Sequence, residues 1–382
     1  MRRALFEDEH DWFRESVATF VDRELMPQRE RFRRQRSIDR ATWLAAGKAG
    51  FLGLGVPAEY GGSGIQDFRF NAVLGEELAR AGFAYSSSFG IQTDVVAPYL
   101  LRLTTEEQRR RWLPGFCRGE IITAIGMTEP AAGSDLKGIR STARRDGDGW
   151  SLSGSKTFIT NGYNADLVVA AAQTPDPGGI SLFAVEDGMG GFTRGNKLDK
   201  LGQHEADTAE LFFDDVQLPA ENLIGEPGRG MAHMMGHLSQ ERISTAVVNV
   251  AHAENVLRLT LDYVKERRAF GHSVGSFQNS RFVLAEADTE LDAARVYVDR
   301  CVEAHVAGEL SAVEAAKAKL LSSEVQNRVI DACLQLHGGY GYIEEYEVAR
   351  SWVDARVTRI WAGTNEIMKE VIGRSLGLEE ER

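Results

Sequence analysis

The chain has 382 residues, 43% hydrophobic and 26% charged, which is the composition of a globular protein with enough length for two or three packed domains. Its 44 basic and 56 acidic residues give a formal net charge of −12, which argues against nucleic acid as the main partner. The three cysteines are widely spaced and the histidines are unpaired, which predicts neither disulfides nor a metal site. The sequence has no hydrophobic segment typical of a signal peptide and no apolar run of roughly 18 residues. We therefore expect a cytoplasmic protein without a membrane span.

Residues 8 to about 120 carry the apolar periodicity of helices. In EHDWFRESVATFVDREL (9–25) apolar residues recur every three or four positions, which predicts an amphipathic helix. Similar stretches follow near 39–50, 68–82, 86–102 and 104–118, separated by Gly and Pro clusters. The basic run RERFRRQRS (29–37) is interpreted as a solvated helix face. We therefore expect an all-α domain over residues 1–121.

The pattern then changes to short strands. STARRDGDGWSLSGSKTFITNG (141–162) predicts two strands joined by a tight Asp-Gly turn, and DLVVAAAQ, GISLFAVE and AELFFDDVQL predict further strands. Because no helical pattern interrupts them, residues 122–228 are expected to form a small barrel or sandwich.

Helical periodicity returns from residue 229 to the end of the chain. Further helices are expected near 275–307, 311–336 and 364–375, so residues 229–382 form a third, helical domain. Gly338 and Gly339 can end one helix with a positive φ, and Thr364 is a plausible N-cap of the last one.

Two segments at the start of the β-region are rich in groups that bind ligands. GMTEPAAGSDLKG (126–138) offers the hydroxyls of Thr128 and Ser134 and the N–H groups of a Gly/Ala loop to a flat heterocycle or a phosphate. From composition alone, an ordinary Pro/Gly loop with caps is the favoured interpretation. In KTFITNG (156–162), Phe158 and Thr160 are two apart, so on a strand they point the same way.

Glu241, in LSQERIS (238–244), is the candidate base. Spacings of four and three place it on one helical face with the apolar Met234, Leu238 and Val248 and with Thr245. A carboxylate on such a face has a raised pKa, which suits a base that works near neutral pH. The alternative is that Glu241 pairs with Arg242 or turns to solvent.

These stretches together resemble the acyl-CoA dehydrogenase family, FAD enzymes that introduce a 2,3-double bond into acyl-CoA thioesters. GMTEPAAGSD and QLHGGYGYIEEY…DAR match its two signature segments, and ERRAFG matches a third landmark. AFGHSVGSFQ and GTNEIMKEVI are similar to the long-chain subgroup. The resemblance implies an α+β, mostly α fold with an N-terminal helical domain, a central β-barrel and a C-terminal four-helix bundle.

The resemblance also implies binding roles. The expected FAD contacts are Ile125, Met127, Thr128, Gly133, Ser134, Phe158, Ile159, Thr160, Thr364 and Glu366. The contacts implied toward the FAD of a neighbouring subunit are Arg267, Phe270, Gln278, Gln335, Leu336, Gly338 and Gly339. The expected substrate contacts are Ser134, Ser239, Arg242, Ala362 and Gly363.

The chain departs from the common family pattern at Ala362, where most members carry the glutamate that acts as the base. The long-chain and isovaleryl subgroups supply this base from an earlier helix, directly before an arginine, and here that position is Glu241. The resemblance further implies fatty-acid β-oxidation, an electron-transfer flavoprotein as acceptor, and a homotetramer. Two alternatives stay open: a flavin oxidase or monooxygenase of the same superfamily, or an inactive FAD-binding scaffold. Residues 89–101, with Val95 and Val96, either line the acyl pocket or pack in the core.

Overall fold

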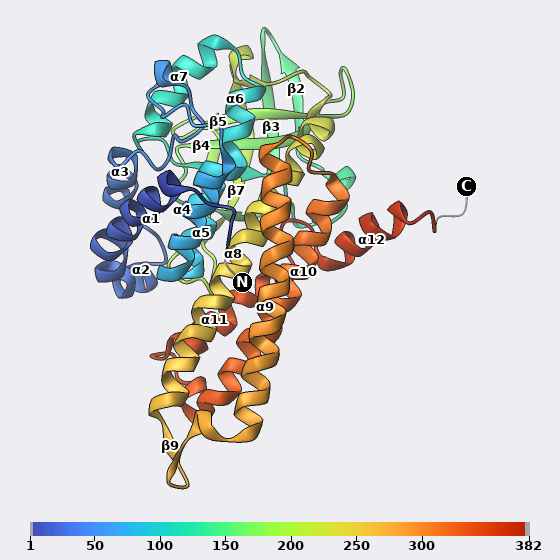
Figure 1. The fold of residues 1–382 in the computed structure, drawn as a ribbon. Coiled ribbons are helices and arrows are strands. Elements are labelled where there is room, and N and C mark those ends of the chain that lie inside the picture. Colours follow the sequence, from blue (N-terminus) through green and yellow to red (C-terminus); the bar gives the residue numbers. More distant parts are fainter. Residues whose placement is uncertain (1–2, 379–382) are drawn as a thin grey trace.

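The structure is a computed structural model that describes residues 3–378. A helical section comes first, a β-sheet follows, and a second helical section closes the chain (Figure 1). This arrangement confirms the expected α+β, mostly α fold with helical ends around a central sheet. The domain boundaries 1–121, 122–228 and 229–382 stay a prediction, and residues 1–2 and 379–382 lie outside the described part.

The first section consists of short helices around an aromatic core. Trp43 stacks on Phe89 with ring centroids 4.5 Å apart, and both rings are buried. A π-helical turn, Ile91–Val96, joins two of the helices. The α-helices are α1 (Asp8–Phe20), α2 (Arg29–Gln35), α3 (Arg40–Lys48), α4 (Phe68–Ala81), α5 (Phe83–Gly90), α6 (Ala97–Arg102) and α7 (Glu106–Cys117).

The basic run on α2 is not simply a solvated face. Arg29 is buried and donates to Glu205, which is fully buried, and to Glu347 at 2.6 Å. Both carboxylates lie far away in the sequence. The prediction was wrong at Arg29 because local charge patterning cannot reveal partners that the fold brings in from other sections.

The central section is one eight-stranded sheet. Its strand order is β6-β7-β3-β2-β4-β5-β8, with β1 parallel to β4. The expected hairpin is β2–β3, closed at Asp146 and Gly149, whereas β1, β6 and β8 were not anticipated. The strands are β1 (Thr123–Gly126), β2 (Thr142–Asp146), β3 (Gly149–Thr160), β4 (Leu167–Gln173), β5 (Ile180–Glu186), β6 (Phe192–Lys197), β7 (Thr208–Leu218) and β8 (Leu223–Ile224).

Strand β4 shows why its sequence is a continuous apolar run. Leu167 and Val169 belong to a core cluster with residues of the N-terminal helices, including Trp112, while Val168 belongs to a second cluster that includes Trp150. Both faces of the strand are therefore buried, and no polar alternation is possible.

Three long helices form the body of the C-terminal section. In Figure 1 they run from the sheet toward a small hairpin of β9 (Arg268–Ala269) and β10 (His272–Ser273), while the last helix projects outward. The short α11 was not expected. The helices are α8 (Gly230–Glu266), α9 (Gln278–Val306), α10 (Ala312–His337), α11 (Glu347–Ala355) and α12 (Asn365–Ser375).

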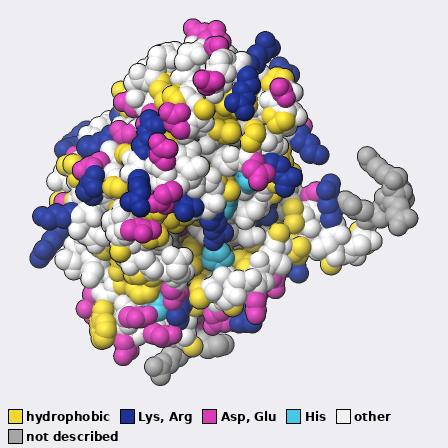
Figure 2. Space-filling view, turned by 90° about the horizontal axis from the view of Figure 1, so that it is seen from above, with side chains coloured by type: hydrophobic (Ala, Val, Ile, Leu, Met, Phe, Trp, Pro, Cys, Tyr) yellow, Lys and Arg dark blue, Asp and Glu magenta, His cyan; other side chains and the backbone are white. Residues whose placement is uncertain are grey.

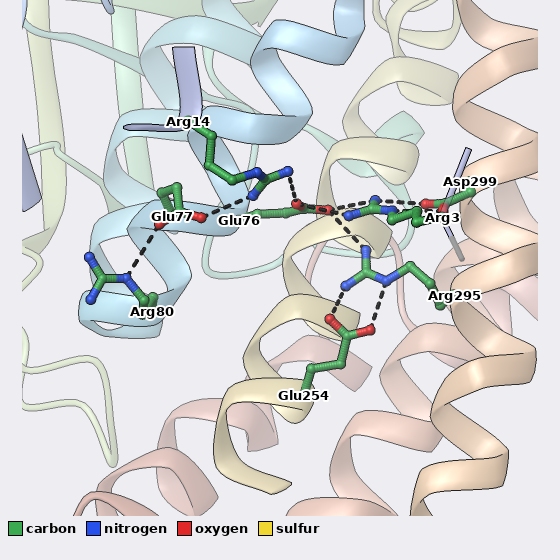
Figure 3. A network of polar contacts seen from close by, with 8 residues as sticks. All are labelled: Arg3, Arg14, Glu76, Glu77, Arg80, Glu254, Arg295 and Asp299. Atoms are coloured by element: carbon green, nitrogen blue, oxygen red, sulfur yellow. Dashed lines mark hydrogen bonds and ion pairs between the residues drawn. The ribbon is translucent and has the colours of Figure 1, made fainter. Parts of the chain in front are cut away.

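A buried carboxylate joins the two helical sections. Glu76 on α4 receives three guanidinium groups, from Arg3 at 2.7 Å, from Arg14 on α1 at 2.8 Å and from Arg295 on α9 at 2.9 Å (Figure 3). Arg295 also pairs with Glu254 on α8. The network therefore ties the N-terminal segment and α1 to the C-terminal helices.

The surface carries charges of both signs. Figure 2 shows Lys and Arg side chains interspersed with Asp and Glu side chains over the face it presents. Between residues 3 and 378 no helix combines the length and the apolar character that crossing a bilayer requires.

Candidate active site

A cavity of about 730 Å³ lies where the sheet meets α5, α8 and the loop before α12. Its walls come from segments far apart in the sequence, so it forms only when the three sections pack together. Twelve of the expected site residues line it: Ile125, Met127, Thr128, Gly133, Ser134, Phe158, Ile159, Thr160, Glu241, Arg242, Ala362 and Gly363.

Glu241 projects from α8 into this cavity. Its carboxylate oxygen Oε1 accepts a hydrogen bond from the hydroxyl of Tyr99 at 3.4 Å. Burial raises the pKa of Glu241 to about 7, while the Tyr99 hydrogen bond and the charge of Arg242 act in the opposite direction. A carboxyl group that titrates near neutrality can both take up and release a proton there.

The apolar face predicted around Glu241 is largely correct. Leu238, Thr245 and Val248 line the cavity with Glu241. Met234 does not, because it is fully buried in the core, and Met231 and Met235 line the cavity instead.

The loop between β1 and β2 is held from behind by a buried ion pair. Lys156 donates to Glu129 at 2.7 Å, and Glu129 also accepts from the backbone N–H groups of Arg140 and Ser141. Burial opposes ionisation of Glu129, but these hydrogen bonds lower the pKa of its carboxyl overall. The loop therefore presents Thr128 and Ser134 to the cavity on a fixed backbone.

Phe158 faces the cavity for a reason the sequence does not reveal. The pairing of β3 with β7 shifts register between Lys156 and Ile159, and Phe158 has a φ of 59°. This bulge re-aims its ring, which is 69% exposed. Simple strand alternation predicted that Phe158 and Thr160 share a side. Both do line the cavity, but through the bulge.

The loop before α12 places free backbone donors at the cavity wall. Ala362 and Gly363 have φ angles of 51° and 82°. Within residues 3–378, the N–H groups of these two residues have no hydrogen-bond acceptor. They can therefore donate to an oxygen atom in the cavity. Thr364 caps α12 as predicted, accepting from the N–H of Ile367 at 3.3 Å.

A second cavity of about 490 Å³ lies at the C-terminal end of α10. The helix ends at His337, and Gly338 has a φ of 59°, as its sequence predicted. The guanidinium of Arg267 lies 5.2 Å from the centre of the Tyr340 ring. The expected residues that line this cavity are Arg267, Gln335, Leu336, Gly338 and Gly339.

Comparison with known proteins agrees with this architecture. The N-terminal, middle and C-terminal domains of acyl-CoA dehydrogenases match residues 7–120, 124–216 and 228–377. The long-chain specific acyl-CoA dehydrogenase of Rattus norvegicus is 44% identical over 379 residues, covering 98% of this chain and 88% of the relative. The chain belongs to the acyl-CoA dehydrogenase family.

Solved structures of the family superpose closely. The crystal structure of an acyl-CoA dehydrogenase from Geobacillus kaustophilus has a TM-score of 0.96 at 45% identity, covering 99% of this chain and 100% of that one. An acyl-CoA dehydrogenase from Bacillus anthracis complexed with FAD has a TM-score of 0.92 at 29% identity, covering 97% and 67%. This acyl-CoA dehydrogenase is thus an FAD-dependent oxidoreductase.

The first cavity of this acyl-CoA dehydrogenase fits FAD. It combines an exposed aromatic ring at Phe158, the hydroxyls of Thr128 and Thr160, and a Gly/Ala loop around Gly133. An apolar wall with a few directed hydrogen-bond groups is the composition expected of a cofactor site.

Five expected site residues line neither cavity: Ser239, Phe270, Gln278, Thr364 and Glu366. Phe270 is 93% exposed at the tip of the β9–β10 hairpin. The second cavity and this hairpin are separate from the first cavity within one chain. Their role toward the FAD of another subunit stays a prediction.

Sequence reasoning missed several wall residues. Phe83, Ser86, Ser87 and Gly90 of α5 line the first cavity at spacings of three, one and three. That is one face of a helix with three small residues, a signal that was available in the sequence. Tyr99 does not line the cavity but contacts Glu241, and it gave no such signal because the contact joins residues 142 positions apart.

Proposed function

We propose that this acyl-CoA dehydrogenase converts an acyl-CoA thioester to the trans-2-enoyl-CoA with Glu241 as the base. One observation carries the proposal: the cavity holds a carboxyl group of raised pKa at position 241, whereas position 362 is alanine. The usual glutamate is absent, and a competent substitute faces the same space.

The reaction needs a base and a site for developing negative charge. Glu241 takes the pro-R α-proton of the thioester, and the electron pair of that C–H bond forms the new double bond. The backbone N–H of Ala362 donates to the thioester carbonyl, where negative charge accumulates as the proton leaves. FAD, when bound, supplies a hydride acceptor for the β-carbon.

In this chain the proposed base and the proposed donor to the thioester oxygen belong to different residues, Glu241 and Ala362. The donor at residue 362 is a backbone N–H, so replacing the family's glutamate with alanine leaves it in place. Moving the base to α8 therefore preserves the site that polarises the substrate.

We further propose that reduced FAD is reoxidised by an electron-transfer flavoprotein, that the enzyme serves fatty-acid β-oxidation, and that it works as a homotetramer. These proposals rest on the family resemblance and on the second cavity, which is lined by residues that the resemblance assigns to the FAD of another subunit. Location in the cytoplasm also stays a prediction, since the rat relative is a mitochondrial enzyme.

The test is anaerobic flavin bleaching by acyl-CoA in wild type and Glu241→Gln. The variant should retain FAD, and its rate of flavin reduction should fall about 10²- to 10⁴-fold, because a general base contributes that much. Glu266→Gln, at the exposed end of the same helix, is the matched control and should reduce at the wild-type rate.

Other outcomes would overturn the proposal. Full bleaching of Glu241→Gln would show that the base lies elsewhere. Rapid oxygen consumption by the wild type without an added acceptor would indicate an oxidase or monooxygenase. A yellow wild-type protein that no thioester bleaches would indicate an inactive scaffold.

A further inference from the structure

Lys319 is a buried lysine beneath the loop that borders the first cavity. It lies on α10 and is fully buried. Its Nζ donates to the carbonyl of Gly363 at 2.7 Å and to Oδ1 of Asn365 at 2.8 Å. Both acceptors are neutral amide oxygens. Burying an ammonium group against neutral partners costs free energy, so we expect Lys319 to have a role that offsets this cost.

The loop that Lys319 holds is conformationally strained. Ala362 has a φ of 51°, a left-handed conformation that residues other than glycine adopt at a cost of roughly 1–3 kcal/mol. Gly363 follows with a φ of 82°. Such a turn persists only where its surroundings determine it, and Lys319 supplies one of the contacts that do so.

The other contacts hold the next residue. Asn365 accepts from Ser323 at 3.1 Å and donates to Glu324 at 2.7 Å. Because a peptide unit is planar, fixing the Gly363 carbonyl also fixes the Gly363–Thr364 peptide. Only the dihedral angles of Ala362 and Gly363 then remain to set the direction of the free N–H groups. Lys319 is the residue that anchors this carbonyl.

The charges around Lys319 also favour an electron-rich ligand. Burial and the charge of Arg242 lower the pKa of Lys319 to about 8, and the carboxylates of Glu366 and Glu324 act in the opposite direction. Arg242 is itself buried and lines the cavity. Lys319 beneath the loop and Arg242 in the cavity wall are thus two buried cations, close enough for the charge of one to act on the other.

We propose that Lys319 is a positioning residue for the dehydrogenation: by anchoring the Gly363 carbonyl, it directs the Ala362 N–H toward the thioester carbonyl. The proposal rests on the proposed function, since it assumes that a thioester oxygen occupies this place. Lys319 acts through the loop and does not contact the substrate.

The experiment compares FAD-loaded wild type, Lys319→Met and Ser323→Ala. Methionine keeps an unbranched side chain and removes the ammonium, whereas Ser323→Ala removes a contact to Asn365 and leaves the Gly363 anchor. Single-turnover flavin reduction gives the limiting rate, and its dependence on acyl-CoA concentration gives the Kd. FAD content and Tm report on folding.

We expect the limiting rate of Lys319→Met to fall about 10- to 100-fold, less than the roughly 100- to 1,000-fold loss when an oxyanion donor is removed outright. Its Kd for acyl-CoA should stay within about threefold, because binding far from the carbonyl is intact. Ser323→Ala should keep a limiting rate within about threefold of wild type. If Lys319→Met does not accumulate as folded holoenzyme, Lys319→Leu, which also lacks a donor, is measured instead, and we again expect a lower limiting rate with a nearly unchanged Kd.

A second readout follows enolate formation without turnover. A 3-thia-acyl-CoA has sulfur in place of the β-carbon, so it cannot give up a hydride, but it loses an α-proton when its carbonyl is polarised. The bound enolate then gives a long-wavelength absorption band with oxidised FAD. Lys319→Met should shift the pH midpoint of this band upward by about one unit, equal to a tenfold loss of enolate stabilisation.

The outcomes separate the two proposals. A wild-type enzyme that no acyl-CoA bleaches refutes the proposed function. Normal bleaching of wild type with an unchanged limiting rate and midpoint in Lys319→Met refutes the role of Lys319 alone. An equal loss in Ser323→Ala also refutes it, because the effect would then come from the whole cluster.

Discussion

The hydroxyl of Tyr99 on α6 lies 3.4 Å from Oε1 of Glu241 on α8 and reaches this carboxylate from outside the lining of the first cavity. Tyr99 is itself fully buried, and burial together with the nearby carboxylate raises its own pKa well above the usual value. Its proton therefore stays on the phenol and is donated to the carboxylate. The contact is made by Oε1, and Oε2 of Glu241 accepts no hydrogen bond from residues 3–378.

Removing this hydrogen bond should move the pH dependence of the enzyme. The bond stabilises the charged form of Glu241, so Tyr99→Phe should raise the pKa of Glu241 above its present value of about 7. The acid limb of kcat/KM should move up by about 0.5 to 1 pH unit, because a base works only when deprotonated. Activity should fall about two- to fivefold at pH 7 and recover near pH 9.

Tyr85→Phe is the control for this prediction. Tyr85 is equally buried and packs on Phe32, and its hydroxyl has no hydrogen-bond partner within the described residues. Its removal should leave the acid limb in place. An identical pH profile for wild type and Tyr99→Phe would show that the contact does not tune the base.

The sequence alone was sufficient to predict features that depend on neighbouring residues, such as helix caps and the face of a helix. The cap at Thr364 and the glycine that ends α10 follow from local backbone requirements, and the structure confirms both. The candidate base at Glu241 could be placed on an apolar face from spacing alone. What spacing could not decide was whether that face borders a cavity or the core.

The remaining features depend on contacts between distant segments. The bulge at Phe158 arises from its pairing with β7, and the burial of Arg29 arises from carboxylates 176 and 318 positions away. Lys319 contacts a loop 44 positions away. None of these has a local signature, so no reading of neighbouring residues could have predicted them.

Phe158 should contribute to FAD binding. Its ring is 69% exposed although it lines the cavity, so a flat ligand would bury it. Phe158→Ala should weaken FAD binding about tenfold, in line with the roughly 0.5–1.5 kcal/mol of an aromatic contact plus the lost buried area. Equilibrium titration of the apoprotein, followed by flavin fluorescence, measures the Kd.

Phe212→Ala is the matched control for the flavin titration. Phe212 is a 40% exposed phenylalanine on β7 that does not line the first cavity. Its removal should leave the Kd for FAD within about twofold. Equal weakening by both substitutions would mean that the loss reflects a general change in the sheet.

Val95 should limit the length of the acyl chain. It lines the first cavity, whereas Val96 is fully buried in the core. Val95→Phe adds volume inside the cavity, so kcat/KM should fall more than about tenfold for long acyl-CoAs and change little for butyryl-CoA. A chain-length series measured by flavin bleaching tests this. A uniform loss at every length would place Val95 away from the acyl tail.

Glu76 should stabilise the fold in a pH-dependent way. Burial opposes its ionisation, but Arg295, Arg3 and Arg14 lower the pKa of Glu76 to about 2 (Figure 3). Because the folded pKa lies below the unfolded value, its contribution is fully present above about pH 4.5 and is lost as the pH falls toward 2.

Glu76→Gln should therefore lower the free energy of unfolding at pH 7 by about 3 kcal/mol, since it removes the carboxylate that pairs with the buried Arg295 and the half-buried Arg3 and Arg14. The difference from wild type in urea denaturation should shrink as the pH falls below 4.5, because the carboxylate of the unfolded wild type is protonated there while the folded one is protonated only near pH 2. Glu254→Gln removes a 41% exposed partner of the same Arg295 and should cost at most about 1 kcal/mol. A loss for Glu76→Gln that is constant from pH 7 to pH 3 would show that packing, and not charge, is what the substitution removes.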